Sequence, residues 1–254
     1  MLIKRSVIER YVKARTALRN GARESLSRAL SQIDFDAPNA YALVHAAVSS
    51  VCTGSAAISA QYAAALYDVL REAQVGGTIG AVAAYEVDEA KLARAAGASV
   101  KAGREKGLAA ALDIAYSRAG YEISAASGQT IYANGVRDGR RVRFARMASG
   151  AETCQFCLML ASRGFVYTSE EAAGYQGHYH ANCDCVVVPQ FAEDVRYEGY
   201  DPDADYVRWQ EAMRSDAEGR ADRNGTSVDE ELEIIRRSLE KSAERARLRA
   251  KHKR

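Results

Sequence analysis

The sequence predicts an α+β protein that is mostly α-helical and carries a small zinc-clasped α/β unit. Apolar residues recur at helical spacings of three and four through the first part of the chain. Four of the five cysteines then lie between Cys154 and Cys185, among short alternating segments. After Phe191 the composition becomes strongly charged. We therefore expect a helical region over residues 1–138, the zinc-clasped unit over 139–191, and an acidic linker with a charged C-terminal helix and tail over 192–254.

The totals are those of an ordinary soluble protein. A chain of 254 residues allows one large domain or two small ones. Its net charge of +2 gives no overall argument for nucleic acid. Met1 and the residues after it run straight into an amphipathic pattern, so we expect no signal peptide. Clustered cysteines without such a segment favour a reducing compartment, and a metal over disulfides.

Four helices are expected in the N-terminal region. The first covers residues 1–32 and ends before Pro38, because proline fits only the first turn of a helix. A second runs over about 38–73, up to a glycine-rich break. Asp88 can cap a third helix that reaches about residue 104. A fourth runs over about 105–137, and Cys52 is expected to be a small core residue.

Charge along the first helix is one-sided. Residues 1–30 carry eight basic and two acidic residues, a net charge of +6. Such a segment is either the solvated face of an ordinary helix or a basic arm that meets phosphates or an acidic partner.

The second helix contains a long uncharged stretch. Residues 37–67 have no Lys, Arg, Asp or Glu and are long enough to span a bilayer. They are rich in Ala, Ser and Thr rather than in Leu and Ile, so we expect a buried central helix and no membrane partner.

The cysteine cluster is the strongest chemical signal. Cys154 and Cys157 form a C-x-x-C pair, and an H-x-x-C-x-C group follows 22 residues later. Soft thiolate and imidazole ligands at this spacing suit Zn²⁺, and four protein ligands would make the site structural. The candidate ligands are Cys154, Cys157, His180, Cys183 and Cys185, of which the sequence does not select four.

Two other interpretations of the cysteines stay open. A C-x-x-C pair also suits a disulfide or thiol exchange, and the cysteines could simply be buried. The metal is favoured because His180 adds a ligand that neither alternative needs.

The zinc-clasped unit is expected to be small. Residues 141–146 and 165–167 alternate as strands, 154–162 favour a short helix, and 185–188 favour a third strand ended by Pro189. Three short strands make a poor hydrophobic core, and units of this size usually need a metal or disulfide staple.

The C-terminal region consists of an acidic segment followed by a basic one. Residues 192–233 have a net charge of −9 and residues 240–254 a net charge of +5. Ser227 and Glu230 have capping-box spacing and begin a narrow apolar stripe that suits docking on a partner or another copy of the chain. The alternative is a tail helix that folds back on its own chain. The basic end could bind DNA weakly.

The segments Phe144 to Gly164 and Tyr179 to Phe191 carry a family resemblance. They combine F-A-R-M-A-S-G-A-E-T-C-Q-F-C with H-A-N-C-D-C-V-V-V-P-Q-F. This combination resembles the bacteriophage Mu F-like minor head (minor capsid) proteins, in the branch found in tailed phages of actinobacteria. Ala181 and Asp184 stand where that family often has Pro and Arg.

The resemblance implies a minor component of the phage head, near the portal, that acts in head assembly or in genome packaging and delivery. It implies the portal or the major capsid protein as partner, packaged DNA as a further contact of the basic termini, and a location in the virion, with host cytoplasm during assembly. A homo-oligomer is also compatible with it.

Two other classes of function remain as alternatives. A zinc-dependent enzyme would need an open metal position and a placed base, for which Glu152, Glu170 and Glu171 qualify only by proximity. A thiol-based enzyme would use the C-x-x-C pair alone. A zinc-binding nucleic-acid module is supported only by the charged ends. We therefore expect no catalytic residues.

Overall fold

The computed structural model describes residues 1–150, 153–168 and 185–251, with side chains up to Lys241. In this part of the chain the order of elements is β1, α1 to α4, β2, α5, β3, β4, α6 and α7. The expectation of a mostly helical α+β protein is confirmed.

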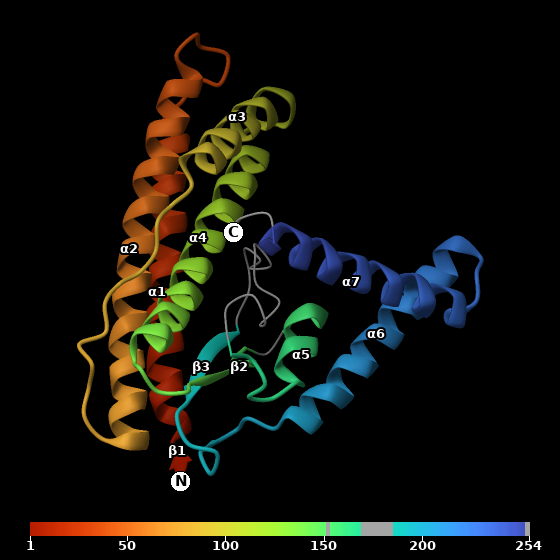
Figure 1. Ribbon diagram of the computed structural model, residues 1–254. Coiled ribbons are helices and arrows are strands. Elements are labelled where there is room, and N and C mark those ends of the chain that lie inside the picture. The colour runs from red at the N-terminus through yellow and green to blue at the C-terminus, as the bar shows by residue number, and fades with distance from the viewer. Residues whose placement is uncertain (151–152, 169–184, 252–254) are drawn as a thin grey trace.

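Four helices form the body of the molecule. They are α1 (Arg5–Leu30), α2 (Ala40–Val75), α3 (Glu89–Lys106) and α4 (Leu108–Arg137). In Figure 1, α1, α2 and α4 run side by side, and α3 packs at the end of the body away from the N-terminus. The helix limits lie close to those expected, because Pro38 and the Asp88 cap are local signals; the Asp88 side chain accepts a hydrogen bond from the Lys91 N–H.

The centre of the body is α4, not α2. The second half of α4 is buried on nearly every side, and its residues there are mostly small, which lets α1, α2 and α3 approach it closely. Gly135 also lets the Phe144 ring approach α4 closely, because a Cβ atom at this position would meet that ring.

The uncharged stretch lies in α2, which is not enclosed as expected. One side of α2 packs on α1, α3 and α4, while its other side exposes large apolar residues: Tyr41, Leu43, Ile58, Tyr62 and Val69. By length and composition α2 could cross a membrane, and 33% of its most apolar window is buried in this fold. The core helix of a soluble protein passes the same test.

An extended strap joins α2 to α3 and is held by side chains. The Asp68 carboxylate accepts hydrogen bonds from the N–H groups of Ile79 and Ala81. The Asn134 side chain pairs with both the N–H and the C=O of Val82, as a neighbouring strand would. The strap therefore satisfies part of its backbone without belonging to a sheet.

A two-stranded antiparallel sheet packs beside α4. It consists of β2 (Arg143–Met147) and β3 (Val186–Gln190), with Phe144 opposite Pro189. Pro189 thus lies inside the strand that it was expected to end. The strand tolerates it because Phe144 exchanges its backbone hydrogen bonds with Tyr167, so the pairing needs no N–H from Pro189. The Pro189 C=O accepts hydrogen bonds from Gln74 and Tyr197. The strand expected over 165–167 is reduced to a bridge between Tyr167 and Phe144.

The second pairing brings the N-terminus to a distant segment. β1 (Leu2–Ile3) lies parallel to β4 (Arg196–Tyr197), and the Met1 ammonium is 3.2 Å from the Asp194 carboxylate. The apolar sides of Ile3 and Tyr197 join one core with both strands of the other sheet.

A helical hairpin follows, where an acidic linker was expected. α6 (Pro202–Asn224) and α7 (Val228–Lys251) pack through Met213, Ala217 and Ile235. The sequence does carry signals for α6, since Asp201 caps it and Pro202 occupies its first turn. The predicted capping box is confirmed: Glu230 accepts a hydrogen bond from the Ser227 N–H, and the Ser227 hydroxyl accepts one from the Glu230 N–H. Figure 1 shows the hairpin extending sideways from the body.

Candidate metal centre

The C-x-x-C pair lies at the start of a short helix. Cys154 is the N-cap of α5 (Gln155–Ala161), and its sulfur accepts a hydrogen bond from the Cys157 N–H at 3.4 Å. Partial positive charge at a helix N-terminus favours the thiolate form of a capping cysteine. Cys154 is exposed and Cys157 is fully buried, so the pair connects the surface of the unit to its interior.

A third predicted ligand, Cys185, contacts Cys157 of this pair. Cys185 directly precedes β3, and its sulfur lies 3.6 Å from the sulfur of Cys157. Two sulfurs bound to one tetrahedral zinc at about 2.3 Å lie about 3.8 Å apart, whereas a disulfide requires about 2.05 Å. The separation excludes a disulfide, and it fits both a hydrogen bond from the Cys157 thiol to the Cys185 sulfur and two ligands of a shared ion.

Two buried arginines surround Cys185. The Arg146 guanidinium donates to the Cys185 sulfur at 3.3 Å, and the Arg15 guanidinium donates to the Cys185 carbonyl at 2.9 Å. Arg146 is 1% exposed and Arg15 is 3% exposed. A cationic N–H donor can stabilise a thiolate, which is the form that binds metal, whereas burial opposes ionisation.

The donor set in the described residues is incomplete. His180 and Cys183 lie outside those residues, as do Glu152, Glu170 and Glu171. Within the described ranges, no group of three or more His, Cys, Asp or Glu side chains gathers closely enough to hold a metal. Cys154, Cys157 and Cys185 are thus placed, while the complete ligand set stays a prediction.

Sequence reasoning missed both arginines. A signal for each was present: Arg15 falls on the apolar side of α1 with Tyr11, and Arg146 continues the alternation of Val142 and Phe144 in β2. A charged residue on the inward face of an element must find a polar partner, so each position predicted a buried polar contact.

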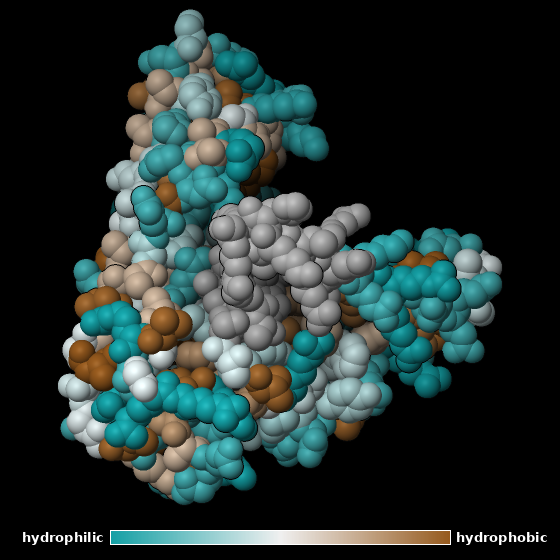
Figure 2. Space-filling view, in the orientation of Figure 1, coloured by the Kyte–Doolittle hydropathy of each residue, from teal (hydrophilic) through white to brown (hydrophobic). Residues whose placement is uncertain are grey.

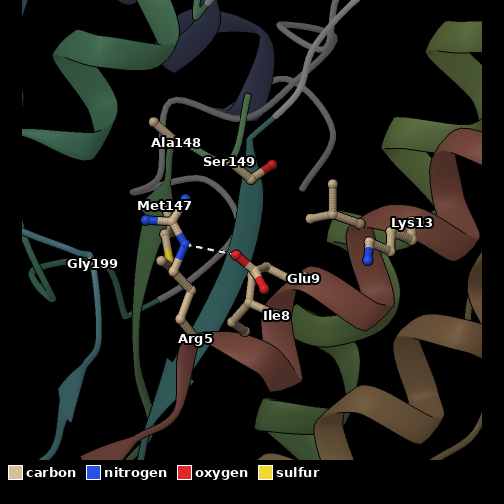
Figure 3. A pocket seen from close by; sticks show the side chains of 9 residues that line it. Arg5, Ile8, Glu9, Lys13, Met147, Ala148, Ser149 and Gly199 are labelled. Atoms are coloured by element: carbon tan, nitrogen blue, oxygen red, sulfur yellow. Dashed lines mark hydrogen bonds and ion pairs between the residues drawn. The ribbon is translucent and has the colours of Figure 1, made fainter. Parts of the chain in front are cut away.

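A small pocket lies at the start of α1 (Figure 3). It has a volume of about 270 Å³ and lies between α1, the end of β2 and Gly199. Its one carboxylate, Glu9, is paired with Arg5 at 2.9 Å. The pocket lining has no histidine or cysteine.

One buried carboxylate in the body of the molecule binds two polar side chains. Glu122 is 1% exposed, forms an ion pair with Arg118 at 2.6 Å and accepts a hydrogen bond from the Tyr85 hydroxyl. Burial, and then this carboxylate, raise the pKa of the Tyr85 hydroxyl far above its ordinary value. Burial also raises the pKa of the Cys52 thiol to about 12, so Cys52 stays a neutral core residue as expected.

Fold and site together define a helical protein that carries a small cysteine-bearing β unit on its side. The chain belongs to the VG15 protein family, whose model matches residues 2–212. It is similar to the Gene 15 protein of Mycobacterium phage L5, with 38% identity in a match that covers 19% of this chain and 29% of that protein. It is also similar to the Gene 15 protein of Mycobacterium phage D29, with 34% identity over 19% of this chain and 28% of that protein.

The match spans less than a third of the length of these curated relatives. No solved structure matches the chain. The family nevertheless establishes that this is a phage protein, whose setting is the virion or the infected cell during assembly.

Proposed function

We propose that this protein is a minor structural component of the phage head near the portal, and that a structural zinc ion clasps its small β unit. The phage family supports the setting. The combined cysteine and histidine motif resembles the Mu F-like minor head proteins, which supports the finer role. The observation that supports the zinc ion is the 3.6 Å separation between the sulfurs of Cys157 and Cys185.

The ligands of the ion would come from Cys154, Cys157, His180, Cys183 and Cys185. A bound zinc would supply a crosslink between the start of α5 and the segment that leads into β3. The two-stranded sheet offers only five paired positions, so a crosslink between its flanking segments would add stability that its small core lacks. The buried guanidinium of Arg146 would orient the Cys185 thiolate and offset its charge.

We further propose that the protein is not an enzyme. Five candidate protein ligands compete for four tetrahedral positions, which would leave no position for a reactive water. The partners in this proposal are the portal or the major capsid protein, with packaged DNA as a contact of the basic first helix and tail.

Zinc analysis tests the chemical half of the proposal. The full chain, purified with a thiol reductant and without chelator, should contain about one zinc per chain. Cys157→Ser should lose the metal, whereas Cys52→Ser removes a distant thiol and should keep it. A wild-type protein with no metal and a Cys157–Cys185 disulfide would overturn the zinc site and leave the head role standing.

Particle analysis tests the biological half. Mass spectrometry of purified particles should find this chain at low copy number beside the portal and major capsid proteins. Gold labelling of a tagged chain should mark one vertex of the head. A chain that is abundant in infected cells and missing from particles would contradict a head component, whatever its metal content.

A further inference from the structure

The turn between α4 and β2 concentrates exposed positive charge. Arg137, Arg140 and Arg141 are exposed, and Arg143 follows two residues later. Asp138, the one carboxylate of this turn, is fully buried and paired with Arg71 at 2.8 Å, so it does not neutralise the surface. Among the described residues, Arg140 and Arg141 form no ion pair or side-chain hydrogen bond. We call Arg137, Arg140 and Arg141 the arginine turn.

The turn between α6 and α7 concentrates the opposite charge. Asp222, Asp229, Glu230 and Glu233 are all exposed there, and Arg223 is the one basic residue in the same span. Glu230 is engaged in the capping box and Glu233 pairs with Arg237. Within the described part of the chain, Asp222 and Asp229 have no side-chain partner. We call these four residues the acidic tip.

The two charged surfaces lie at opposite ends of the molecule. The arginine turn lies at the end of α4 nearest the N-terminus, whereas the acidic tip is the far end of the hairpin (Figure 1). The hairpin is held to the rest of the described chain mainly through α5 and α6, including a hydrogen bond from the Gln155 side chain to the Ala212 carbonyl. Figure 2 shows the hairpin as an arm with a largely hydrophilic surface. In this conformation, one molecule cannot bring its own turn and tip together.

Each surface also carries an exposed aliphatic side chain among its charges. Val136, in the last turn of α4, is 80% exposed, and Ile234, one residue after Glu233, is 51% exposed. An apolar contact bordered by complementary charges is the usual pattern of a protein interface. A DNA backbone would use the arginines but would leave Val136 in water.

We propose that the acidic tip of one copy of this chain binds the arginine turn of a second copy. The contact is head-to-tail, because each copy offers one surface of each kind. Repeating a head-to-tail contact gives a closed ring or an open chain of molecules. Single exposed ion pairs are weak, so the interface depends on several charges acting together and weakens as salt rises.

Charge reversal of the full chain tests this contact. Sedimentation velocity at low salt should show concentration-dependent association of the wild type, lost as salt increases toward about 0.5 M. Arg140→Glu with Arg141→Glu should weaken association at least about tenfold, and Asp222→Arg with Asp229→Arg should do the same. Arg94→Glu with Lys101→Glu makes an equal charge change on exposed positions of α3 and should leave association unchanged.

A mixture of the two reversed variants is the decisive measurement. Each reversed surface then meets its complement on the other variant, so the mixture should sediment faster than either variant alone. A wild type that stays monomeric at every concentration and salt, or a mixture that stays monomeric, overturns the proposal. So does a result in which Arg140→Glu with Arg141→Glu lowers retention on duplex DNA and leaves self-association intact, since the turn would then serve phosphates.

Discussion

The sulfurs of Cys157 and Cys185 lie 3.6 Å apart, although the two residues are 28 positions apart in the sequence. Cys157 lies in the first turn of α5 and Cys185 directly precedes β3, so their contact joins these two segments. Arg146 reaches the same sulfur from β2. Three separate elements thus converge on one thiol.

Loss of either thiol should destabilise the β unit. Cys157→Ser and Cys185→Ser should each lower the melting temperature by about 5–10 °C, because the zinc crosslink is lost along with a buried group. Differential scanning calorimetry with and without a chelator measures this. Chelator should lower the melting temperature of the wild type and leave that of both variants unchanged. An unchanged wild type under chelator contradicts a structural ion.

Arg146 should tune metal affinity rather than create the site. Arg146→Met keeps a long side chain but removes the N–H donor at the Cys185 sulfur. Zinc affinity should fall about 10–100-fold, as for other groups that hydrogen-bond a metal ligand. Competition with a zinc indicator measures the affinity. Arg143→Met, three residues earlier and half-buried, should change it little; an equal loss in both variants would point to general damage to β2.

Gly135 should not tolerate a side chain. A Cβ atom at this position would lie 2.3 Å from an atom of the Phe144 ring, so the ring or the helix must shift. Gly135→Ala should lower the free energy of unfolding by about 1–3 kcal/mol. The control is Gly54→Ala in α2, where a Cβ meets nothing within 4 Å and the change should stabilise by about 0.5–1 kcal/mol. Chemical denaturation distinguishes these opposite signs.

Asn134 should hold the strap. Its side chain accepts from the Val82 N–H at 3.0 Å and donates to the Val82 C=O at 2.8 Å. Asn134→Ala should cost about 2–3 kcal/mol, because both strap groups lose a partner. Hydrogen exchange should show faster exchange of the Val82 amide in the variant. The exposed Asn20→Ala is the control, and an equally protected Val82 amide in both variants would show that the strap is held by other contacts.

Cys52 should lower the free energy of unfolding as the pH becomes alkaline. Burial raises the pKa of its thiol to about 12, above the value of about 8.5 expected in the unfolded chain. Between these values only the unfolded chain loses this proton, so the contribution is full below about pH 8.5 and is lost as pH rises toward 12. Unfolding free energies between pH 8 and 11 should therefore fall less steeply for Cys52→Ala than for the wild type. Parallel curves would contradict the raised pKa.

Local signals in the sequence predict where most of the helices begin. Asp88 caps α3 through its own side chain, and Ser227 with Glu230 forms the box that begins α7. The same kind of signal exists for α6 in Asp201 and Pro202, although the acidic composition of this segment favours a linker. Caps act within one turn of the chain, so their effect is present in the sequence itself.

The tertiary structure alone decided which distant groups meet. The sequence offered five ligand candidates with no order among them, and packing brought Cys157 to Cys185 with Arg15 and Arg146 around them. Packing also buried α4 more completely than the uncharged α2, and it let Pro189 stay within β3 because Phe144, opposite it, bonds to Tyr167 instead. Hydrophobic spacing specifies which face of an element is buried, but the partner of that face depends on how all the elements pack together.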